Sequence, residues 1–138
     1  GLAAEAAAVS SFNSKLWLED TGDGEHWIVC ADLEYDSDLL HGIVVLPIRS
    51  ETDLATMPKI IRPIWPKSGK HNRADVLHDG GYRGLLRTVH GEPIHLIKPL
   101  CDLLFLEALE LCGIGKVKRT LMYRFVRRYA QKALGQRP

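Results

Sequence analysis

The chain is poor in cysteine, and its three cysteines, Cys30, Cys101 and Cys112, are an odd number without a CxxC motif or a spacing typical of metal ligands. This pattern argues against a disulfide framework, which small secreted domains build from an even number of cysteines. The chain also lacks an apolar run near the ~18 residues that a membrane-spanning helix requires. We therefore expect a globular domain whose cysteines are small buried residues in a reducing environment.

Acidic residues are missing from the end of the chain. Residues 116–138 carry eight basic residues and no acid, whereas residues 1–40 carry nine acids and a single base, Lys15. The two ends are therefore expected to attract one another or different partners. The first twelve residues are alanine-rich, contain Glu5 and have no basic region, so we expect no signal peptide but a flexible or partner-docked arm over residues 1–12.

The order of patterns along the chain predicts an α+β fold in one domain, residues 1–138. Residues 14–48 contain segments rich in aromatic and β-branched residues between turn residues, which predict an N-terminal three-stranded antiparallel β-meander. Three prolines within nine residues then exclude a long helix and predict a proline-rich loop. About three helices follow, beginning near Asn72, near Pro99 and near Gly115.

One face of the first predicted helix is polar. Four polar or aromatic residues at positions i, i+3, i+4 and i+7 share this face, namely Asp75, His78, Asp79 and Tyr82. Such a face is most often the solvated side of a helix, but the opposite face here carries little apolar area. Gly80 and Gly81 each cost about 1 kcal/mol relative to alanine in a helix interior. We therefore expect either a close approach to the backbone there or an early helix end.

The second predicted helix carries an acid on its apolar side. Asp102 lies on the stripe that contains Phe105, Leu106, Leu109 and Cys112. An unpaired carboxylate in such a setting is strongly unfavourable, so it needs a hydrogen-bonding or ionic partner. Two alternatives remain: Asp102 interacts with the positive end of the helix dipole, or it has a buried partner, for which His78 is the best candidate.

A pairing of His78 with Asp102 would have chemical consequences. A histidine held by a carboxylate through one ring nitrogen presents the other nitrogen as a base near neutral pH. Asp79, which follows His78, could then help to bind Ca²⁺, since calcium accepts carboxylate and backbone carbonyl oxygens. Such a site would deprotonate a water molecule and stabilise an ester oxyanion.

These residues carry a resemblance to a known enzyme family. The pattern HDxxY, here His78, Asp79 and Tyr82, followed by CDLLF at residues 101–105, resembles the paired helices of secreted-type, calcium-dependent phospholipases that cleave the sn-2 ester. The resemblance covers about a quarter of the chain. It implies that His78 is the catalytic base, Asp79 a calcium ligand, Asp102 the group that orients the histidine and Tyr82 part of its support.

A longer resemblance covers roughly residues 43–130. The segments TDLATMP, WPKSGKHNRADVLHDGGYR, CDLLFLEAL and GKVKRTLMYRFVRRY are similar to a small phage and prophage family that is classified only as a domain of unknown function. This resemblance adds Asp53 to the candidate residues, as a cap for a following helix or as a group facing His78. It implies a phage-encoded protein of the virion's tail or host-contact apparatus, located in the virion or in the host cytoplasm during assembly.

The sequence therefore leaves three candidate functions. The first is a lipid esterase with calcium as cofactor, which would act on lipid or the cell envelope. The second is a purely structural tail, neck or baseplate component that binds other virion proteins through its N-terminal arm and basic last helix. The third is binding by that helix of phosphate, as in lipid headgroups, or of nucleic acid, the less expected of the two. The apolar stripe of the helix is predicted at Val117, Leu121, Phe125 and Ala133. No nucleic-acid motif accompanies the helix, so we do not expect nucleic acid as the partner.

Overall fold

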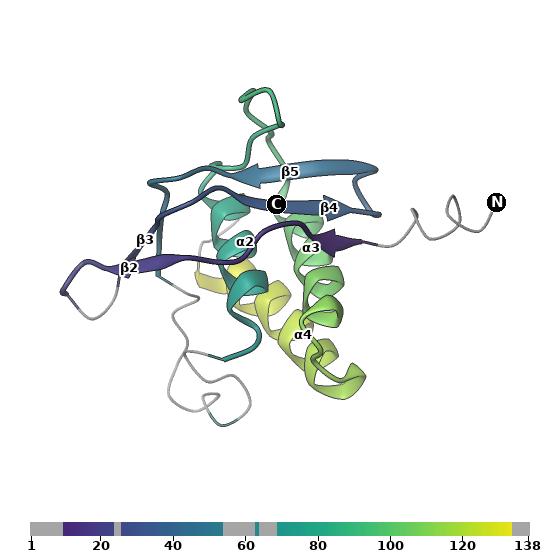
Figure 1. Cartoon of the computed structure of the whole chain (residues 1–138). Helices are drawn as coiled ribbons and strands as arrows, with labels where there is room; N and C mark the ends of the chain where they lie inside the picture. Colours follow the sequence, from purple (N-terminus) through teal and green to yellow (C-terminus); the bar gives the residue numbers. More distant parts are fainter. Residues whose placement is uncertain (1–9, 24–25, 54–62, 64–68, 134–138) are drawn as a thin grey trace.

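Two small antiparallel sheets and three helices make up the described part of the chain (Figure 1). The computed structural model describes residues 10–23, 26–53, 63 and 69–133. The strands are β1 (Ser11–Phe12), β2 (Leu18–Asp20), β3 (Trp27–Val29), β4 (Leu33–Ser37), β5 (Gly42–Leu46) and β6 (Glu51–Thr52). The helices are α2 (Asn72–Tyr82), α3 (Lys98–Leu111) and α4 (Lys116–Ala133). This arrangement confirms the predicted α+β class.

The strands pair in the orders β1-β4-β5 and β2-β3-β6. The predicted single meander is thus divided, because residues 27–37 bend after Val29 and place β3 and β4 in different sheets. Backbone hydrogen bonds hold this bend: the Val29 amide donates to the carbonyl of Ser50 at 2.8 Å, and the Arg49 amide donates to the carbonyl of Val29 at 2.7 Å. The returning chain thereby adds β6, a strand that the local pattern did not predict.

Part of the predicted N-terminal arm belongs to a sheet. Ser11 and Phe12 pair with Asp36 and Tyr35 of β4, and the rings of Phe12 and Tyr35 lie 4.6 Å apart. The prediction of an arm is therefore wrong for these two residues, because the ring contact and the strand pairing hold them. Residues 1–9 lie outside the described residues, as does most of the predicted proline-rich loop.

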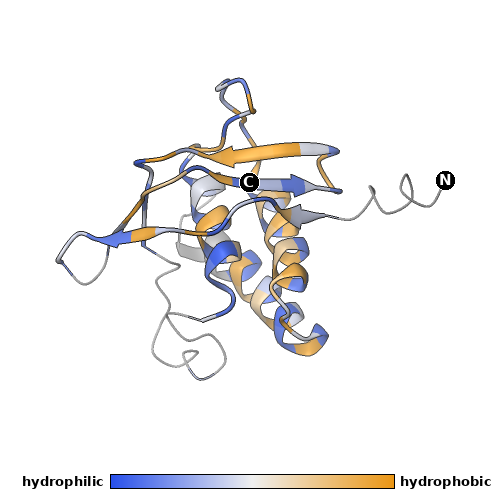
Figure 2. Ribbon diagram, viewed as in Figure 1, coloured by the Kyte–Doolittle hydropathy of each residue, from blue (hydrophilic) through white to orange (hydrophobic). Residues whose placement is uncertain are grey.

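The hydrophobic core lies between the β1-β4-β5 sheet and the helices, and α3 packs against both α2 and α4 (Figure 1). Strand β4 buries every second residue, as expected when one face of a sheet is covered. Strand β5 buries its last three residues in succession, so both of its faces are covered at that end. Figure 2 shows the apolar character of β5 along most of its length. The described helices include none with the length and apolarity needed to cross a membrane.

The boundaries of α3 agree with the sequence prediction. Ile97 is its N-cap, Pro99 lies in its first turn, and Gly113 follows its end with a φ of +82°. The predicted stripe of α4 is wrong in its first half, because Val117 and Leu121 are 75% and 46% exposed. Helix α4 instead buries Met122 and Val126 against the core. The same helix carries Arg127, whose side chain reaches Asp102 of α3.

Candidate functional site

Asp102 of α3 is fully buried at the centre of a polar cluster. Nε2 of His78 lies 2.6 Å from Oδ1 of Asp102, and the Tyr82 hydroxyl donates to the same oxygen at 2.7 Å. The other oxygen, Oδ2, accepts from Nη1 of Arg127 at 2.7 Å. The predicted contact between Asp102 and His78 is confirmed, and the carboxylate joins side chains from α2, α3 and α4.

Close packing of α2 depends on its two glycines. A Cβ atom at Gly80 would lie 2.6 Å from Cδ1 of Leu46, and one at Gly81 would lie 3.0 Å from Sγ of Cys101. These separations are at or below the limit for carbon in contact with another heavy atom, so with a larger residue the Leu46 or Cys101 side chain, or α2 itself, would have to shift. The expected close approach to the backbone is thereby confirmed. Gly81 precedes Tyr82 and Cys101 precedes Asp102 in the chain. This packing therefore also sets the distance between the side chains of Tyr82 and Asp102.

Hydrogen bonds keep Asp102 ionised in spite of its burial. Burial alone would raise the pKa of Asp102, but hydrogen bonds from His78, Tyr82 and Arg127, together with the charge of His78, lower it below its usual range. Burial and the hydrogen bond to Asp102 raise the pKa of Tyr82 above its usual range, so its hydroxyl stays protonated and donates. Asp102 therefore acts as an acceptor for all three neighbours.

His78 is oriented so that one ring nitrogen is held and the other is not. The side chain is mostly buried, and the centre of its ring lies 4.4 Å from that of Tyr82 and 4.8 Å from that of Phe105. Nε2 faces the acceptor Asp102, so we assign the ring proton to Nε2. Nδ1 makes no hydrogen bond with any described residue. A ring held in this way presents Nδ1 as a proton acceptor.

Asp79 and Asp53 meet at an arginine that the sequence interpretation did not single out. Nε of Arg83 donates to Oδ1 of Asp79 at 3.0 Å, and Nη2 of Arg83 lies 3.5 Å from Oδ2 of Asp53. Burial and the charge of Asp53 raise the pKa of Asp79, while Arg83 acts in the opposite direction. Oδ2 of Asp79 is buried and has no hydrogen-bond partner among the described residues. A helix capped by Asp53 would fall on residues 54–62, outside the described part of the chain.

These residues do not by themselves complete a calcium site. Calcium takes about six to eight oxygen ligands, and the described ranges contain no group of three or more His, Cys, Asp or Glu side chains placed to hold a metal. The guanidinium of Arg83 already counters the charges of Asp79 and Asp53. Further ligands would have to be backbone or amide carbonyls, water molecules or side chains outside the described residues, so calcium binding by Asp79 stays a prediction.

A second buried His–Asp pair lies at the start of α2. Nδ1 of His71 contacts Oδ2 of Asp75, and the two residues are 2% and 0% exposed. Nε2 of His71 has no hydrogen-bond partner within the described ranges. The i,i+4 spacing of the pair is a local signal that could have indicated it. Asp75 therefore belongs to the core and not to a solvated helix face.

A family model places the chain in a protein family that has no assigned function. The model of the family "Protein of unknown function (DUF1353)" matches residues 27–126, a range that contains His78, Tyr82 and Asp102 and ends just before Arg127. Comparison with curated proteins and with solved structures found no match. The phage origin and the phospholipase similarity stay predictions. Because the family model matches well over half of the chain, this protein belongs to the DUF1353 family of proteins of unknown function.

Proposed function

We propose that this protein is an ester hydrolase in which His78 is the general base and Asp102 orients it. One observation carries the proposal: Nε2 of His78 lies 2.6 Å from a carboxylate that is fully buried, while Nδ1 is not engaged by the described residues. A base needs this combination of a fixed ring and an accessible nitrogen. The resemblance of HDxxY and CDLLF to the phospholipase helices suggests a phospholipid with an sn-2 ester as substrate.

In the proposed reaction, Nδ1 of His78 removes a proton from a water molecule while the water oxygen attacks the ester carbonyl carbon. The imidazolium that forms is stabilised by the negative charge of Asp102. Collapse of the tetrahedral intermediate then breaks the bond to the alkoxide, which takes the proton from His78, so the products are a carboxylic acid and an alcohol. Tyr82 and Arg127 are positioning residues, because they hold the Asp102 carboxylate.

The biological setting of this proposal comes from the resemblance to phage and prophage proteins. We place the hydrolase in the tail or host-contact apparatus of a virion, where it would meet the lipid or cell envelope of the host. Other virion proteins would then be its partners, and the virion or the host cytoplasm during assembly its location. Mass spectrometry of purified particles tests this placement independently of any activity.

A structural role without catalysis has its own supporting observation. Arg127 binds the same carboxylate as His78, so Asp102 ties three helices together whether or not a reaction takes place. Buried polar networks of this kind specify how helices pack. On this alternative the protein is a tail, neck or baseplate component.

Phosphate binding by α4 has less support. Arg119 contacts Glu110 and the carbonyl of Ile114, and Arg127 contacts Asp102, so part of the basic charge is already used within the fold. A steep fall of affinity with salt concentration would favour this third function.

The hydrolase is tested with the purified full chain on phospholipid vesicles and on a soluble short-chain ester, each with added Ca²⁺ and with EDTA. We expect His78→Gln to lower the rate by about 10²–10⁴-fold, the usual contribution of a general base. The matched control is His90→Gln, because His90 is an exposed histidine of the loop after α2. Circular dichroism shows whether both variants fold. Wild-type protein that is inactive on all esters under both metal conditions would favour the structural role.

A further inference from the structure

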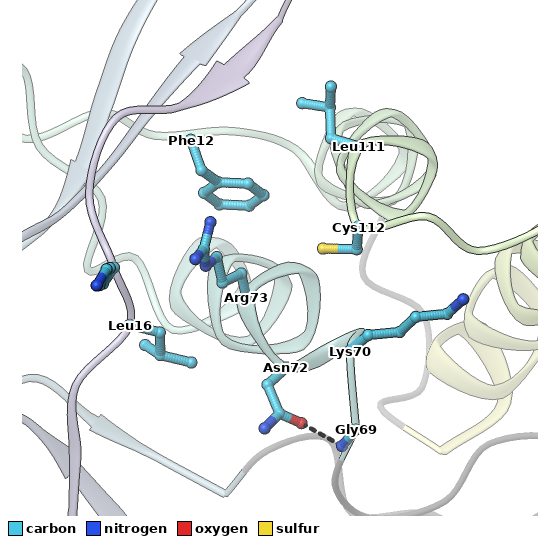
Figure 3. A pocket seen from close by; sticks show the side chains of 9 residues that line it. Phe12, Leu16, Gly69, Lys70, Asn72, Arg73, Leu111 and Cys112 are labelled. Atoms are coloured by element: carbon cyan, nitrogen blue, oxygen red, sulfur yellow. Dashed lines mark hydrogen bonds between the residues drawn. The ribbon is translucent and has the colours of Figure 1, made fainter.

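A second candidate site lies at the beginning of α2. A cavity of about 540 Å³ opens between α2, the end of α3 and the segment that joins β1 to β2 (Figure 3). Its walls include Phe12, Lys15, Leu16, Lys70, Arg73 and Leu111, and we call it the cationic pocket. Pockets of this size typically hold a small organic ligand. His78 is not among the lining residues, so the pocket is separate from the proposed hydrolase site.

Positive charge dominates the cationic pocket. Lys15, Lys70 and Arg73 line it, and none of its described lining residues is acidic. The Arg73 guanidinium carbon lies 5.5 Å from the centre of the Phe12 ring, and the Arg73 side chain makes no ion pair or hydrogen bond within the described part of the chain. Figure 3 shows Arg73 beneath Phe12 near the middle of the pocket. An arginine without a carboxylate partner can offer both arms of its guanidinium to an anion.

The nearby acid does not cancel this charge. Asp75 lies close enough to act on Cys112, a lining residue, together with Arg73. However, Asp75 is a single acid, is fully buried and contacts His71, so it offsets only part of the charge of Lys15, Lys70 and Arg73. The apolar wall also contributes, because Phe12, Leu16 and Leu111 can cover the uncharged part of a ligand.

We propose that the cationic pocket binds a small organic phosphate that also carries an apolar part. The phosphate group would contact Arg73, Lys15 and Lys70, since arginine binds phosphate oxygens in pairs and lysine adds a point charge. The apolar part would lie against Phe12 and Leu16. A soluble nucleotide and the headgroup region of an anionic phospholipid share this chemistry, and the experiment distinguishes them.

The experiment uses the full chain with defined probes. Isothermal titration calorimetry measures binding of inorganic phosphate and adenosine monophosphate, and sedimentation measures binding to phosphatidylcholine vesicles with and without phosphatidic acid. We expect binding to one class of organic phosphate, weakened about tenfold or more by Arg73→Met through loss of a charge-assisted hydrogen bond. The matched control is Arg124→Met, which removes an exposed arginine of α4 and should leave the affinity unchanged.

Each outcome decides between the alternatives. Binding of the nucleotide alone identifies a soluble ligand, and binding of phosphatidic acid vesicles alone identifies a lipid headgroup. No binding of any probe overturns the proposal, as does an equal loss in Arg73→Met and Arg124→Met, which indicates unspecific attraction of charge. If Arg73→Met does not fold, the double substitution Lys15→Gln, Lys70→Gln takes its place, with an expected loss of about fivefold. Unchanged affinity in that double variant also overturns the proposal.

Discussion

Replacing Asp102 by asparagine is the most direct test of the polar cluster. The substitution keeps the shape of the side chain but removes its charge and turns one acceptor oxygen into a donor. In the wild type both oxygens accept, Oδ1 from His78 and Tyr82 and Oδ2 from Arg127. An asparagine has one acceptor oxygen and one NH2 donor group. Whichever way the amide turned, its NH2 group would therefore face another donor. Arg127 would also lose the partner of its charge.

The burial of Asp102 determines how much unfolding free energy the substitution removes. Removing one member of a buried charge pair costs about 3–5 kcal/mol, because the other charge is left without a partner. Asp102 is fully buried, but the Arg127 side chain is 23% exposed and can be partly hydrated after the substitution. The asparagine oxygen still accepts on one side, so one or two of the three hydrogen bonds are lost, and because the three share one carboxylate their separate contributions do not add. We therefore expect a loss of about 3 kcal/mol in the free energy of unfolding, a large share of the ~5–15 kcal/mol that stabilises a domain.

Urea unfolding followed by circular dichroism measures this loss, with exposed Asp38→Asn as the matched control. Because the folded-state pKa of Asp102 is lowered, its contribution is present above the unfolded-state pKa of about 3.9 and disappears as the pH falls through the folded-state value. The difference between wild type and Asp102→Asn should therefore shrink in acid. A loss below about 1 kcal/mol at neutral pH would refute the reasoning, since that is the scale of an ordinary single hydrogen bond.

Two further substitutions test the packing and the charges around the cluster. Gly80→Ala is expected to lower the free energy of unfolding by about 1–2 kcal/mol, although alanine normally stabilises a helix, because its Cβ would lie 2.6 Å from Cδ1 of Leu46; a urea midpoint at or above that of the wild type would contradict the close packing of α2. Asp79→Asn is expected to raise the urea midpoint at neutral pH, because a raised pKa means that the charged form of Asp79 opposes folding. The wild type regains this stability below the unfolded-state pKa of about 3.9, so the advantage of the variant should vanish there. If the variant were less stable than the wild type at neutral pH, the ion pair with Arg83 would outweigh the cost of burying Asp79.

The helix pair that carries the cluster was largely predictable from local pattern. The apolar stripe of α3 and the positions of Pro99 and Gly113 defined that helix before its surroundings were known. Asp102 on the apolar side required a partner, because burial of a lone carboxylate is too unfavourable. His78 was the best candidate, and the contact is present. Its catalytic role, that of Tyr82 and the calcium role of Asp79 stay predictions.

Other features of the fold had no local signal. Residues 27–37 have the composition of one long strand, but hydrogen bonds to Arg49 and Ser50 divide them between two sheets. Helix α4 offers more than one partly apolar face, and packing against α3 selected the face with Met122 and Val126. These choices depend on segments far away in the chain, whose positions a local pattern does not contain.

For the charged residues of the candidate site, too, some contacts follow from the local sequence and others only from the tertiary structure. That Asp102 must be satisfied follows from the residue types around it in the helix, because the cost of desolvating a carboxylate is a property of the side chain and its burial. That Arg127 shares this carboxylate, and that Asp53 contacts Arg83, was decided by how the helices and β6 meet in space. The pair of Asp79 and Arg83 instead has the local i,i+4 spacing of a helix. Periodicity states which side of a helix must be covered, whereas the identity of the covering side chain depends on contacts between residues distant in the chain.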